Sequence, residues 1–196
     1  MLYRIFDDMT QCSEQEVARL LPLVSAQRRE QALRYKHTFG QYCCLQSYKM
    51  LCELLAEWGR AHPTPYTLHP TPIFLYNDYG APYIEGGPHF SISHCKRGIA
   101  VVVSENPIGI DIEAIRTFSP ELMRKTMNED EQLRITSSAI PEVEFIRFWT
   151  QKEALLKLQG TGIISDLHHV LAHTNDISWT EMINQEKGYI CTIATR

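Results

Sequence analysis

The sequence lacks the features that mark several common classes of protein. None of its apolar runs approaches the ~20 residues that span a bilayer, and its N-terminus carries no signal peptide. We therefore expect a cytoplasmic protein without membrane contact. Its six cysteines form no C-x-x-C pair and no disulfide-framework spacing, which favours reduced thiols. Positive charge is not in excess either, and the net charge of −4 argues against a nucleic-acid partner.

The residues that are present suit an ordinary globular protein. Hydrophobic residues make up 44% and charged residues 21% of the 196 residues. A chain of this length can bury a substantial core, either as one domain or as two small halves. The sequence itself shows no internal repeat that would decide between the two.

The most informative stretch runs from Ile108 to Glu113, where apolar and acidic residues alternate. Alternation with period two predicts a strand whose isoleucines point one way while Asp111 and Glu113 point the other. Two carboxylates on one face repel each other unless a cation lies between them, and hard oxygen ligands suit Mg²⁺. For this stretch alone, a solvated strand face is the more common explanation.

A second informative stretch, residues 141–159, has the pattern of a helix that Pro141 opens and Gly160 closes. Apolar residues recur at helical spacing and predict the buried face: Phe145, Phe148, Leu155 and Leu158. An adjoining stripe carries residues three or four apart: Trp149, Lys152, Glu153, Leu156 and Lys157. Charges at the edge of a core need partners, and a metal and a phosphate ester would supply them.

The remaining patterns predict further helices and antiparallel strands, and hence an α+β fold. Helices are expected after Ser13, Ser25, Ser119 and Asn128, and a long helix is expected from Gly40 to Trp58, ended by Gly59. A loop over 60–72 follows. Strands are expected at 2–6 and, as three antiparallel pairs, at 73–76 with 82–84, at 89–94 with 99–104, and at 177–182 with 189–194. The strands at 89–94, 99–104 and 108–113 should bring His94, Lys96 and Arg97 close to the two acids.

Three motifs in this order resemble one known family. They are Phe90-Ser91-Ile92-Ser93-His94, Gly109-Ile110-Asp111-Ile112-Glu113, and Trp149-x-x-Lys152-Glu153-Ala154-x-x-Lys157, with Gly160-x-Gly162 just beyond. Together they are similar to the 4′-phosphopantetheinyl transferases of the larger, Sfp-like type. The resemblance covers roughly residues 25–165.

The resemblance implies a fold of two related α+β halves, a pseudo-dimer within one chain. Each half would have a small antiparallel sheet packed on helices, with the active site in the cleft between them. We place the N-terminal half at residues 1–104 and the C-terminal half, which carries the acids, at residues 105–196. The expected oligomeric state is a monomer.

The resemblance also implies the reaction and its partners. The enzyme would move the 4′-phosphopantetheine arm of coenzyme A onto a serine of an apo acyl or peptidyl carrier protein. The reaction would require Mg²⁺ and release 3′,5′-ADP, with coenzyme A as the substrate. Which carrier protein and which pathway it serves do not follow from the sequence.

By the same resemblance, Asp111, Glu113 and Glu153 are the metal ligands. Glu153 has two possible roles, third ligand or base for the serine proton, and these compete because a metal-bound carboxylate has a lowered pKa. Glu131 is a second candidate for the base, although capping of its own helix is the commoner role for a glutamate at that position.

Four cationic or polar groups are expected to bind the phosphates of coenzyme A. Ser93 and His94 match the family's Ser-His pair. Lys152 and Lys157 would neutralise phosphate as point charges, and Lys157 is also expected to be a catalytic residue. Arg28 is the fifth candidate, at the nucleotide end. The chain departs from the family at Gln31, Cys43 and Ala81, where basic residues are usual, so recognition of the 3′-phosphate is the open part of the assignment.

Other classes of protein fit less well. A non-catalytic module that binds coenzyme A or a carrier protein would have an eroded site, whereas the three acids are intact here. A Mg²⁺-dependent nuclease would want a lysine two residues beyond Glu113, where the chain has Ile115. A glycosidase needs two carboxylates on either side of a sugar, and two acids on one strand face look into the same site.

Overall fold

A computed structural model describes residues 1–62, 74–162 and 166–196 of the chain. Among its described residues, the first part of the chain has three α-helices and five strands: β1 (Leu2–Phe6), α1 (Glu14–Leu20), α2 (Ala26–Leu33), α3 (Thr38–Ala61), β2 (Leu75–Tyr76), β3 (Pro82–Tyr83), β4 (His89–Cys95) and β5 (Gly98–Ser104). Three of the strands form an antiparallel sheet in the order β1-β5-β4, and β2 pairs with β3 in a small hairpin.

The second part of the chain repeats the combination of one three-stranded sheet with three helices. Its elements are β6 (Ile108–Ala114), α4 (Pro120–Thr126), α5 (Glu129–Thr136), α6 (Pro141–Gln159), β7 (Ser178–Asn184) and β8 (Tyr189–Thr195). The sheet is antiparallel with the order β6-β8-β7, so β6 lies at its edge.

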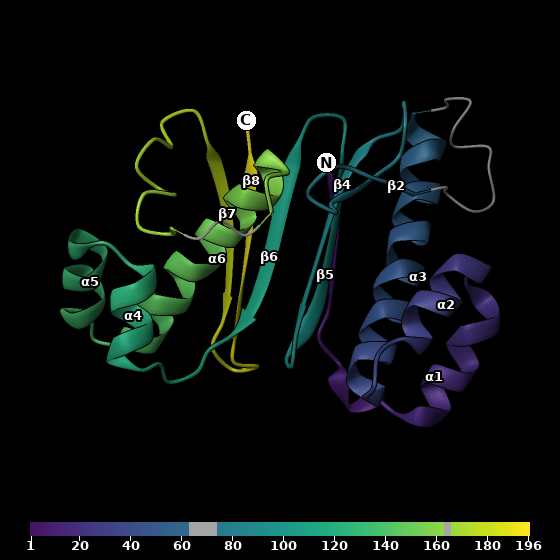
Figure 1. The fold of residues 1–196 in the computed structure, drawn as a ribbon, viewed down its shortest axis with the longest axis horizontal. Helices are drawn as coiled ribbons and strands as arrows, with labels where there is room; N and C mark the ends of the chain where they lie inside the picture. The colour runs from purple at the N-terminus through teal and green to yellow at the C-terminus, as the bar shows by residue number, and fades with distance from the viewer. Residues whose placement is uncertain (63–73, 163–165) are drawn as a thin grey trace.

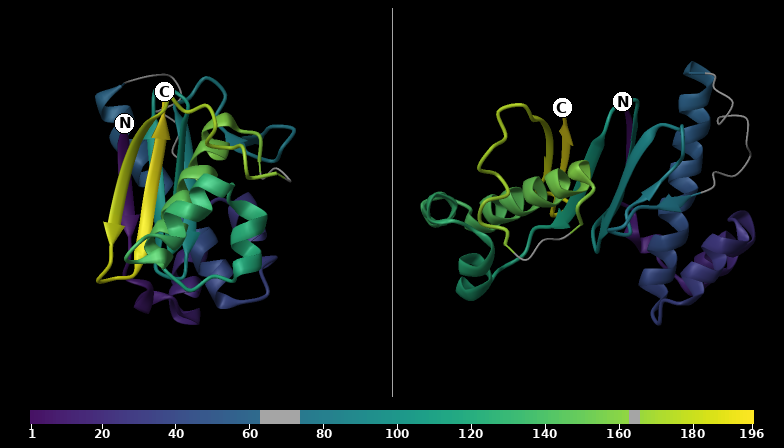
Figure 2. Two further views of the ribbon diagram at one scale, coloured as in Figure 1. Left: turned by 90° about the vertical axis from the view of Figure 1, so that its left-hand side faces the viewer. Right: turned by 45° about the horizontal axis from the view of Figure 1, so that its top comes forward.

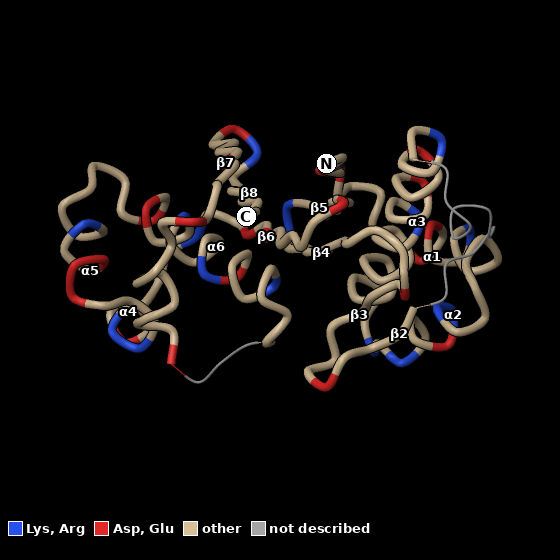
Figure 3. Tube along the Cα trace, turned by 90° about the horizontal axis from the view of Figure 1, so that it is seen from above, with Lys and Arg blue, Asp and Glu red and all other residues tan. Residues whose placement is uncertain are grey.

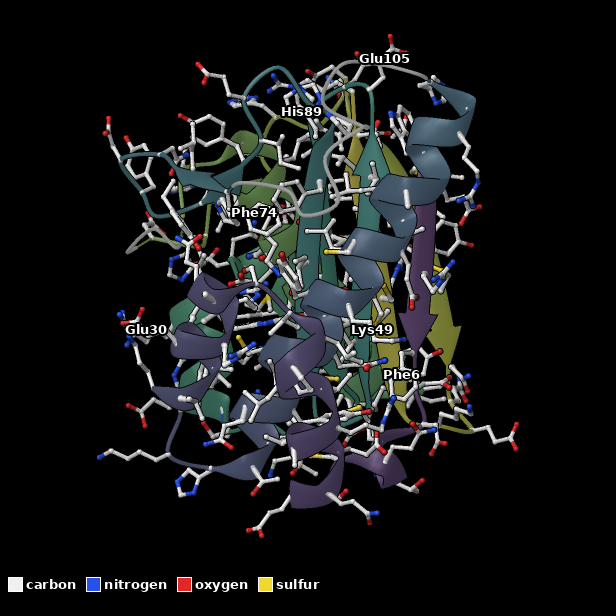
Figure 4. The ribbon with its side chains drawn as sticks, turned by 90° about the vertical axis from the view of Figure 1, so that its right-hand side faces the viewer. Phe6, Glu30, Lys49, Phe74, His89 and Glu105 are labelled. Atoms are coloured by element: carbon white, nitrogen blue, oxygen red, sulfur yellow. The ribbon has the colours of Figure 1, made fainter. Side chains whose placement is uncertain are left out.

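The two sheets lie back to back in the middle of the molecule, and each has a long helix on its outer face (Figures 1 and 2). Figure 4 shows α3 lying over the first sheet, with Phe6 at one end of the sheet and His89 and Glu105 at the other. On β5, Val101 and Val103 pack toward α3, while Ala100 and Val102 face the second sheet. This alternation buries both faces of β5, which is why all of its residues are buried.

An apolar core shared by the two sheets joins them. It contains Ala100 and Val102 from β5, isoleucines of β6, and Cys191 and Ile193 from β8. Alternate residues of β8, Ile190 and Ala194, face the other way and pack with the helices of the second part. The predicted alternation of β6 is confirmed, since Ile110 and Ile112 belong to this shared core.

Local sequence signals explain where most helices begin and end. The hydroxyls of Ser13, Ser25 and Ser119 each accept an N–H bond from the first turn of the helix that follows. Asn128 and Glu131 form the reciprocal bonds of a capping box, as predicted. Gly160 ends α6 with a left-handed backbone (φ 68°), which glycine adopts without steric cost.

The predicted end of the long helix was wrong. Helix α3 begins at Thr38 and continues through Gly59 to Ala61, where His62 closes the last turn by donating its N–H to Trp58 O. The His62 ring also stacks on the Trp58 ring with the centroids 4.0 Å apart, which stabilises one more turn than the glycine signal predicts. Most of the predicted loop over 60–72 lies outside the described residues.

The fold class is therefore confirmed at the level of small antiparallel sheets packed with helices. The position proposed for the division, between residues 104 and 105, falls in the turn that joins β5 to β6. That this turn separates two related halves, with a cleft between them, stays a prediction. Within the described residues, no helix is both long and apolar enough to cross a membrane. Acidic and basic residues are interspersed along the described parts of the chain (Figure 3).

Candidate active site

Gly109 allows helix α6 to lie directly on strand β6. A Cβ atom at this position would lie only 2.6 Å from the backbone nitrogen of Leu158 and would overlap the carbonyl oxygen of Ala154. The absence of a side chain therefore brings the two backbones into contact. Because Asp111 and Glu113 share the helix-facing side of β6 with Gly109, they come to lie beside Glu153 and Lys157 of α6.

The Asp111 carboxylate is held from two directions. The Ser93 hydroxyl on β4 donates to Asp111 Oδ1 at 2.7 Å, and the Lys157 ammonium donates to the same oxygen at 2.7 Å. Lys157 also donates to the carbonyl oxygen of Ile110 at 3.1 Å. Three of the predicted site residues, from three different elements, are thus in direct contact. Both contacts orient the Asp111 carboxylate toward β4 and α6.

Glu113 and Glu153 lie in the same electrostatic environment as Asp111. Desolvation raises the pKa of the Glu113 carboxyl, and the Asp111 charge adds to the rise. Desolvation and the Asp111 and Glu113 charges also raise the pKa of Glu153, while the Lys157 ammonium opposes the rise. Arg116 lies 3.9 Å from Glu113 Oε1 and is half exposed. Three carboxylates here share one close ammonium group, and this local excess of negative charge favours a cation.

The chemistry of this set fits a hard divalent cation. Carboxylate oxygens are the ligands that Mg²⁺ takes, and the raised pKa values of Glu113 and Glu153 show two carboxyls that an added positive charge would stabilise. Across the described ranges, however, no three His, Cys, Asp or Glu side chains already stand close enough together to hold a metal ion. Asp111, Glu113 and Glu153 are the carboxylates that would hold such a cation.

His94 follows Ser93 on β4 and is accessible to solvent. Its ring meets the Phe39 ring edge-on, with the centroids 6.1 Å apart. The surrounding protein desolvates the imidazole, and this, together with the Lys157 ammonium, lowers the pKa of His94. The ring is therefore neutral at pH 7 and carries one N–H that can donate to a phosphate oxygen.

Lys152 lies apart from these residues, although the sequence places it on the same stripe as Lys157. Its side chain is 1% exposed, and its ammonium donates to Glu131 Oε2 at 2.6 Å, to Thr126 O at 2.7 Å and to Leu167 O at 2.9 Å. All three donors are used, so none remains for a phosphate. This placement conflicts with the expectation that Lys152 neutralises the substrate.

Glu131 is the partner of that ammonium and is also buried. Besides Lys152, its carboxylate accepts the backbone N–H of Asn128 at 2.9 Å. These bonds tie Glu131 into the cap of α5, and the bond to Lys152 joins that cap to α6. The capping role expected for Glu131 is the one that the structure shows.

Arg28 belongs to α2 and contacts α3. Its guanidinium stacks over the Tyr48 ring, 5.0 Å from the centroid, and donates to Gln31 Oε1 at 2.8 Å. Gln31, one of the departures from the family pattern, is thus in contact with the one arginine that remains there. Lys96 and Arg97 were expected near the acids. Instead they line a pocket together with Asp7, which follows β1, and Lys187, which lies in the turn between β7 and β8.

Two contacts near the site were not predicted from the sequence. The Ser91 hydroxyl accepts the backbone N–H of Ile110 at 3.1 Å, and the Asn77 amide donates to Gly160 O at 3.0 Å. Ser91 shares one face of β4 with Ser93, and two polar residues alternating along a buried strand are a signal that could have identified it. The partner of Asn77 lies 83 residues away, and no local pattern points to it.

Comparison with known proteins supports the family expected from the motifs. The profile of the 4′-phosphopantetheinyl transferase superfamily matches residues 107–194. A 4′-phosphopantetheinyl transferase of Bacillus subtilis is 30% identical over 168 residues, which cover 83% of this chain and 71% of the relative. The 4′-phosphopantetheinyl transferase Sfp of Bacillus subtilis (strain 168) is 27% identical over 167 residues, with the same two coverages.

A third relative matches a shorter stretch. The 4′-phosphopantetheinyl transferase gsp of Aneurinibacillus migulanus is 32% identical over 93 residues, which cover 46% of this chain and 39% of that protein. The profile match spans both motifs of the acidic site, and the longer alignments extend over most of the chain. The chain therefore belongs to the 4′-phosphopantetheinyl transferase superfamily and is an enzyme of that transferase class.

Proposed function

We propose that this enzyme moves the phosphopantetheine arm of coenzyme A onto a serine of an apo acyl or peptidyl carrier protein, with Mg²⁺ as its cofactor and 3′,5′-ADP as the second product. The observation that carries the proposal is the Asp111 carboxylate held by Ser93 and Lys157, with Glu113 and Glu153 beside it. Carboxylates gathered around one ammonium suit a site that handles a metal and a pyrophosphate together.

Asp111, Glu113 and Glu153 are the residues that would hold the metal. When bound there, Mg²⁺ would neutralise charge on the pyrophosphate and on the leaving group. The chain adds two groups of its own. The Lys157 ammonium, from the last turn of α6, bonds to Asp111 and can exchange that contact for a phosphate oxygen. The neutral His94 can donate its N–H to a second phosphate oxygen.

In the proposed reaction the serine oxygen of the carrier attacks the β-phosphorus of coenzyme A. A new serine–phosphorus bond forms, and the bond between that phosphorus and the bridging oxygen breaks. The bridging oxygen leaves with the electron pair as part of 3′,5′-ADP, and the serine proton passes to a base. The work of the protein is to align the serine with the breaking bond and to stabilise negative charge.

Glu153 is the residue that we propose for either of two roles, metal ligand or base. Glu131 is a weaker candidate for the base, because Lys152 and the N–H of Asn128 already occupy its carboxylate. The roles of Glu153 can be separated by Glu153→Gln. Loss of a ligand lowers the affinity for Mg²⁺ measured by calorimetry, whereas loss of the base leaves that affinity unchanged and lowers kcat alone.

The nucleotide end of coenzyme A has fewer cationic partners here than in the family pattern. With Gln31, Cys43 and Ala81 in place of basic residues, Arg28 is the one candidate that we retain for the 3′-phosphate. A single partly exposed contact is worth on the order of 1–2 kcal/mol, or roughly five- to thirtyfold in KM. Dephospho-coenzyme A should therefore remain a substrate, with a KM higher than that of coenzyme A by no more than about this factor.

The central experiment is incubation of the enzyme with coenzyme A, Mg²⁺ and a panel of apo carrier proteins, followed by intact-mass measurement. The expected result is a carrier that gains the mass of the arm only when Mg²⁺ is present. A protein that binds coenzyme A but modifies no carrier would instead be a binding module with an eroded site. The panel also identifies which carrier class is used.

Asp111→Asn tests the metal site with little change in shape. It removes one charge while it keeps an oxygen toward Ser93, so the fold should survive. The affinity for Mg²⁺ and the rate of transfer should fall together, by roughly two orders of magnitude or more. Transfer at the parent rate in limiting Mg²⁺ would contradict the assignment of Asp111 as a ligand.

A further inference from the structure

Two edge strands from different sheets meet beside the acidic site. Strand β4 ends the order β1-β5-β4, and β6 begins the order β6-β8-β7. On one side each strand has its own sheet partner, and on the other side its backbone groups need different partners. Ile110 on β6 is fully buried, so an unpaired N–H at that position would carry a large cost.

Serine side chains of β4 supply the missing partners. The Ser91 hydroxyl is buried and accepts the N–H of Ile110 at 3.1 Å, in place of a strand carbonyl. Two residues along the same face of β4, the Ser93 hydroxyl donates to Asp111 Oδ1 at 2.7 Å. Two successive residues of β6 are thus attached to two alternate residues of β4, one through its backbone and one through its side chain.

We propose that Ser91 is a positioning residue of the transferase: its bond to the N–H of Ile110 fixes where β6 lies along β4 and thereby places the Asp111 carboxylate against Ser93. The inference deepens the proposed function and rests on it. Ile110 directly precedes Asp111, so any movement of the Ile110 peptide is passed to the Asp111 backbone. A hydroxyl suits this position because it can accept one bond from the edge strand within the space of a small side chain.

Loss of the Ser91 hydroxyl has a defined consequence. In Ser91→Ala, the Ile110 N–H has lost its acceptor and can regain one only from water, which requires β6 to move away from β4. Such a movement shifts Asp111 relative to Ser93 and His94. A misplacement of about 1 Å in a phosphoryl-transfer site can lower the rate by up to ~100-fold. The effect should appear in kcat, because positioning of the reacting groups is changed while substrate contacts are kept.

The test compares Ser91→Ala with Ser91→Thr, which keeps the hydroxyl, and with Ser47→Ala as a matched control. Ser47 is also buried, but its hydroxyl donates to Cys44 O within α3, on the far side of the first sheet. Each variant is assayed for kcat and KM at a temperature where unfolding measurements show it fully folded. Hydrogen exchange of the Ile110 amide is followed by NMR as a readout that does not depend on activity.

The proposal predicts at least a tenfold lower kcat for Ser91→Ala, selectively faster exchange at Ile110, and recovery of both in Ser91→Thr. Unchanged kcat and exchange in Ser91→Ala would overturn it, as would a loss of kcat matched by Ser47→Ala. If Ser91→Ala does not fold, Ser91→Cys, a weaker acceptor of similar size, replaces it with the same outcomes. A parent enzyme that modifies no carrier refutes the proposed function instead, whatever the exchange at Ile110 shows.

Discussion

At the scale of single residues, the two lysines of α6 show how helical spacing separates roles. Lys152 and Lys157 are five residues apart, which places them roughly 140° apart around the helix. Lys157 therefore faces β6 and contacts Asp111, whereas Lys152 faces α4 and α5 and contacts Glu131. We propose that the first serves the reaction and the second the fold.

The Lys152–Glu131 pair predicts a large effect on stability. Lys152→Met should lower the free energy of unfolding by roughly 3–5 kcal/mol, because it leaves the buried Glu131 carboxylate without its charged partner. The double variant Lys152→Met, Glu131→Gln should recover part of that loss. Urea unfolding measures both, and Lys125→Met on the exposed face of α4 is the control. A loss no larger than that of Lys125→Met would show that the buried pair does not stabilise the fold.

The raised pKa values of Glu113 and Glu153 predict that stabilisation by Mg²⁺ depends on pH. Below the ordinary glutamate pKa of 4.5 both carboxyls are neutral in the folded and unfolded states. As pH rises through the higher folded pKa values, they ionise against desolvation and mutual repulsion, so the metal-free protein loses stability over that window. A cation binds the ionised carboxylates, so at pH values below this window it must compete with protons for them.

The increase in Tm on adding Mg²⁺ should therefore be larger at pH 7.5 than at pH 5. At a concentration 100 times the dissociation constant, bound Mg²⁺ would add about 2.7 kcal/mol to the free energy of unfolding. Because each comparison is made with and without Mg²⁺ at one pH, titration of His94 and other groups largely cancels. Asp111→Asn is the control. An equal increase at both pH values would contradict the involvement of these carboxylates.

At the scale of elements, the contact between β6 and α6 depends on Gly109. Gly109→Ala should lower the free energy of unfolding by about 3 kcal/mol or more. The added methyl group would overlap the backbone of α6, which, unlike a flexible side chain, cannot rotate out of the way. Gly80→Ala is a useful comparison. Its backbone has a positive φ of 77° but nothing lies within 4 Å of the added carbon, so only the conformational cost of about 1 kcal/mol applies.

Transfer activity separates the two glycine variants further. Gly109→Ala should reduce it even where the protein is folded, because α6 carries Glu153 and Lys157 away from β6. Urea unfolding followed by circular dichroism gives the stabilities, and the intact-mass assay gives the rates. Equal stability of the two variants would mean that α6 can retreat from β6 at no cost.

The sequence predicts elements well where the signal is local. Helix α6 has the predicted bounds, because Pro141 and Gly160 act within one turn of the helix that they delimit. Glycine at position 59 was a weaker signal, since glycine is also tolerated inside helices at modest cost, and contacts of Trp58 and His62 extend α3 past it. Local signals are reliable where no tertiary contact competes.

The site shows the same limit. Glu153 and Lys157, four residues apart on α6, were predicted to share one face, and the strand alternation predicted that Asp111 and Glu113 would share another. The partners of Lys152 lie 15, 21 and 26 residues away, and those distances along the chain carry no periodic signal. Spacing fixes the direction of a side chain, whereas the group that it meets depends on the whole fold.

At the scale of the molecule, the apolar core between the two sheets should make the chain unfold as one unit. Each sheet contributes side chains that the other covers, and the Asp7 carboxylate adds a tie by accepting from Lys187 at 2.6 Å and Tyr189 at 3.1 Å. A division at residue 104 into independent folding units would expose both faces of this core to water.

Tryptophan fluorescence tests this cooperativity, because Trp58 lies in the first part of the chain and the other two tryptophans, Trp149 and Trp179, lie in the second. One variant keeps only Trp58, through Trp149→Phe and Trp179→Phe, and the other carries Trp58→Phe. The substitutions change stability, so two unfolding midpoints in urea are compared within each variant. The midpoint measured by fluorescence should coincide with the midpoint measured by circular dichroism. Separate midpoints within one variant would indicate two independent domains.

The core between the sheets also contains two thiols, Cys95 from β4 in the first sheet and Cys191 from β8 in the second. Desolvation raises the pKa of Cys95 to about 11 and raises that of Cys191 further. At neutral pH both are protonated and shielded, so an alkylating reagent can reach them only while the sheets are apart. Their rate of labelling would therefore report how often the two sheets separate.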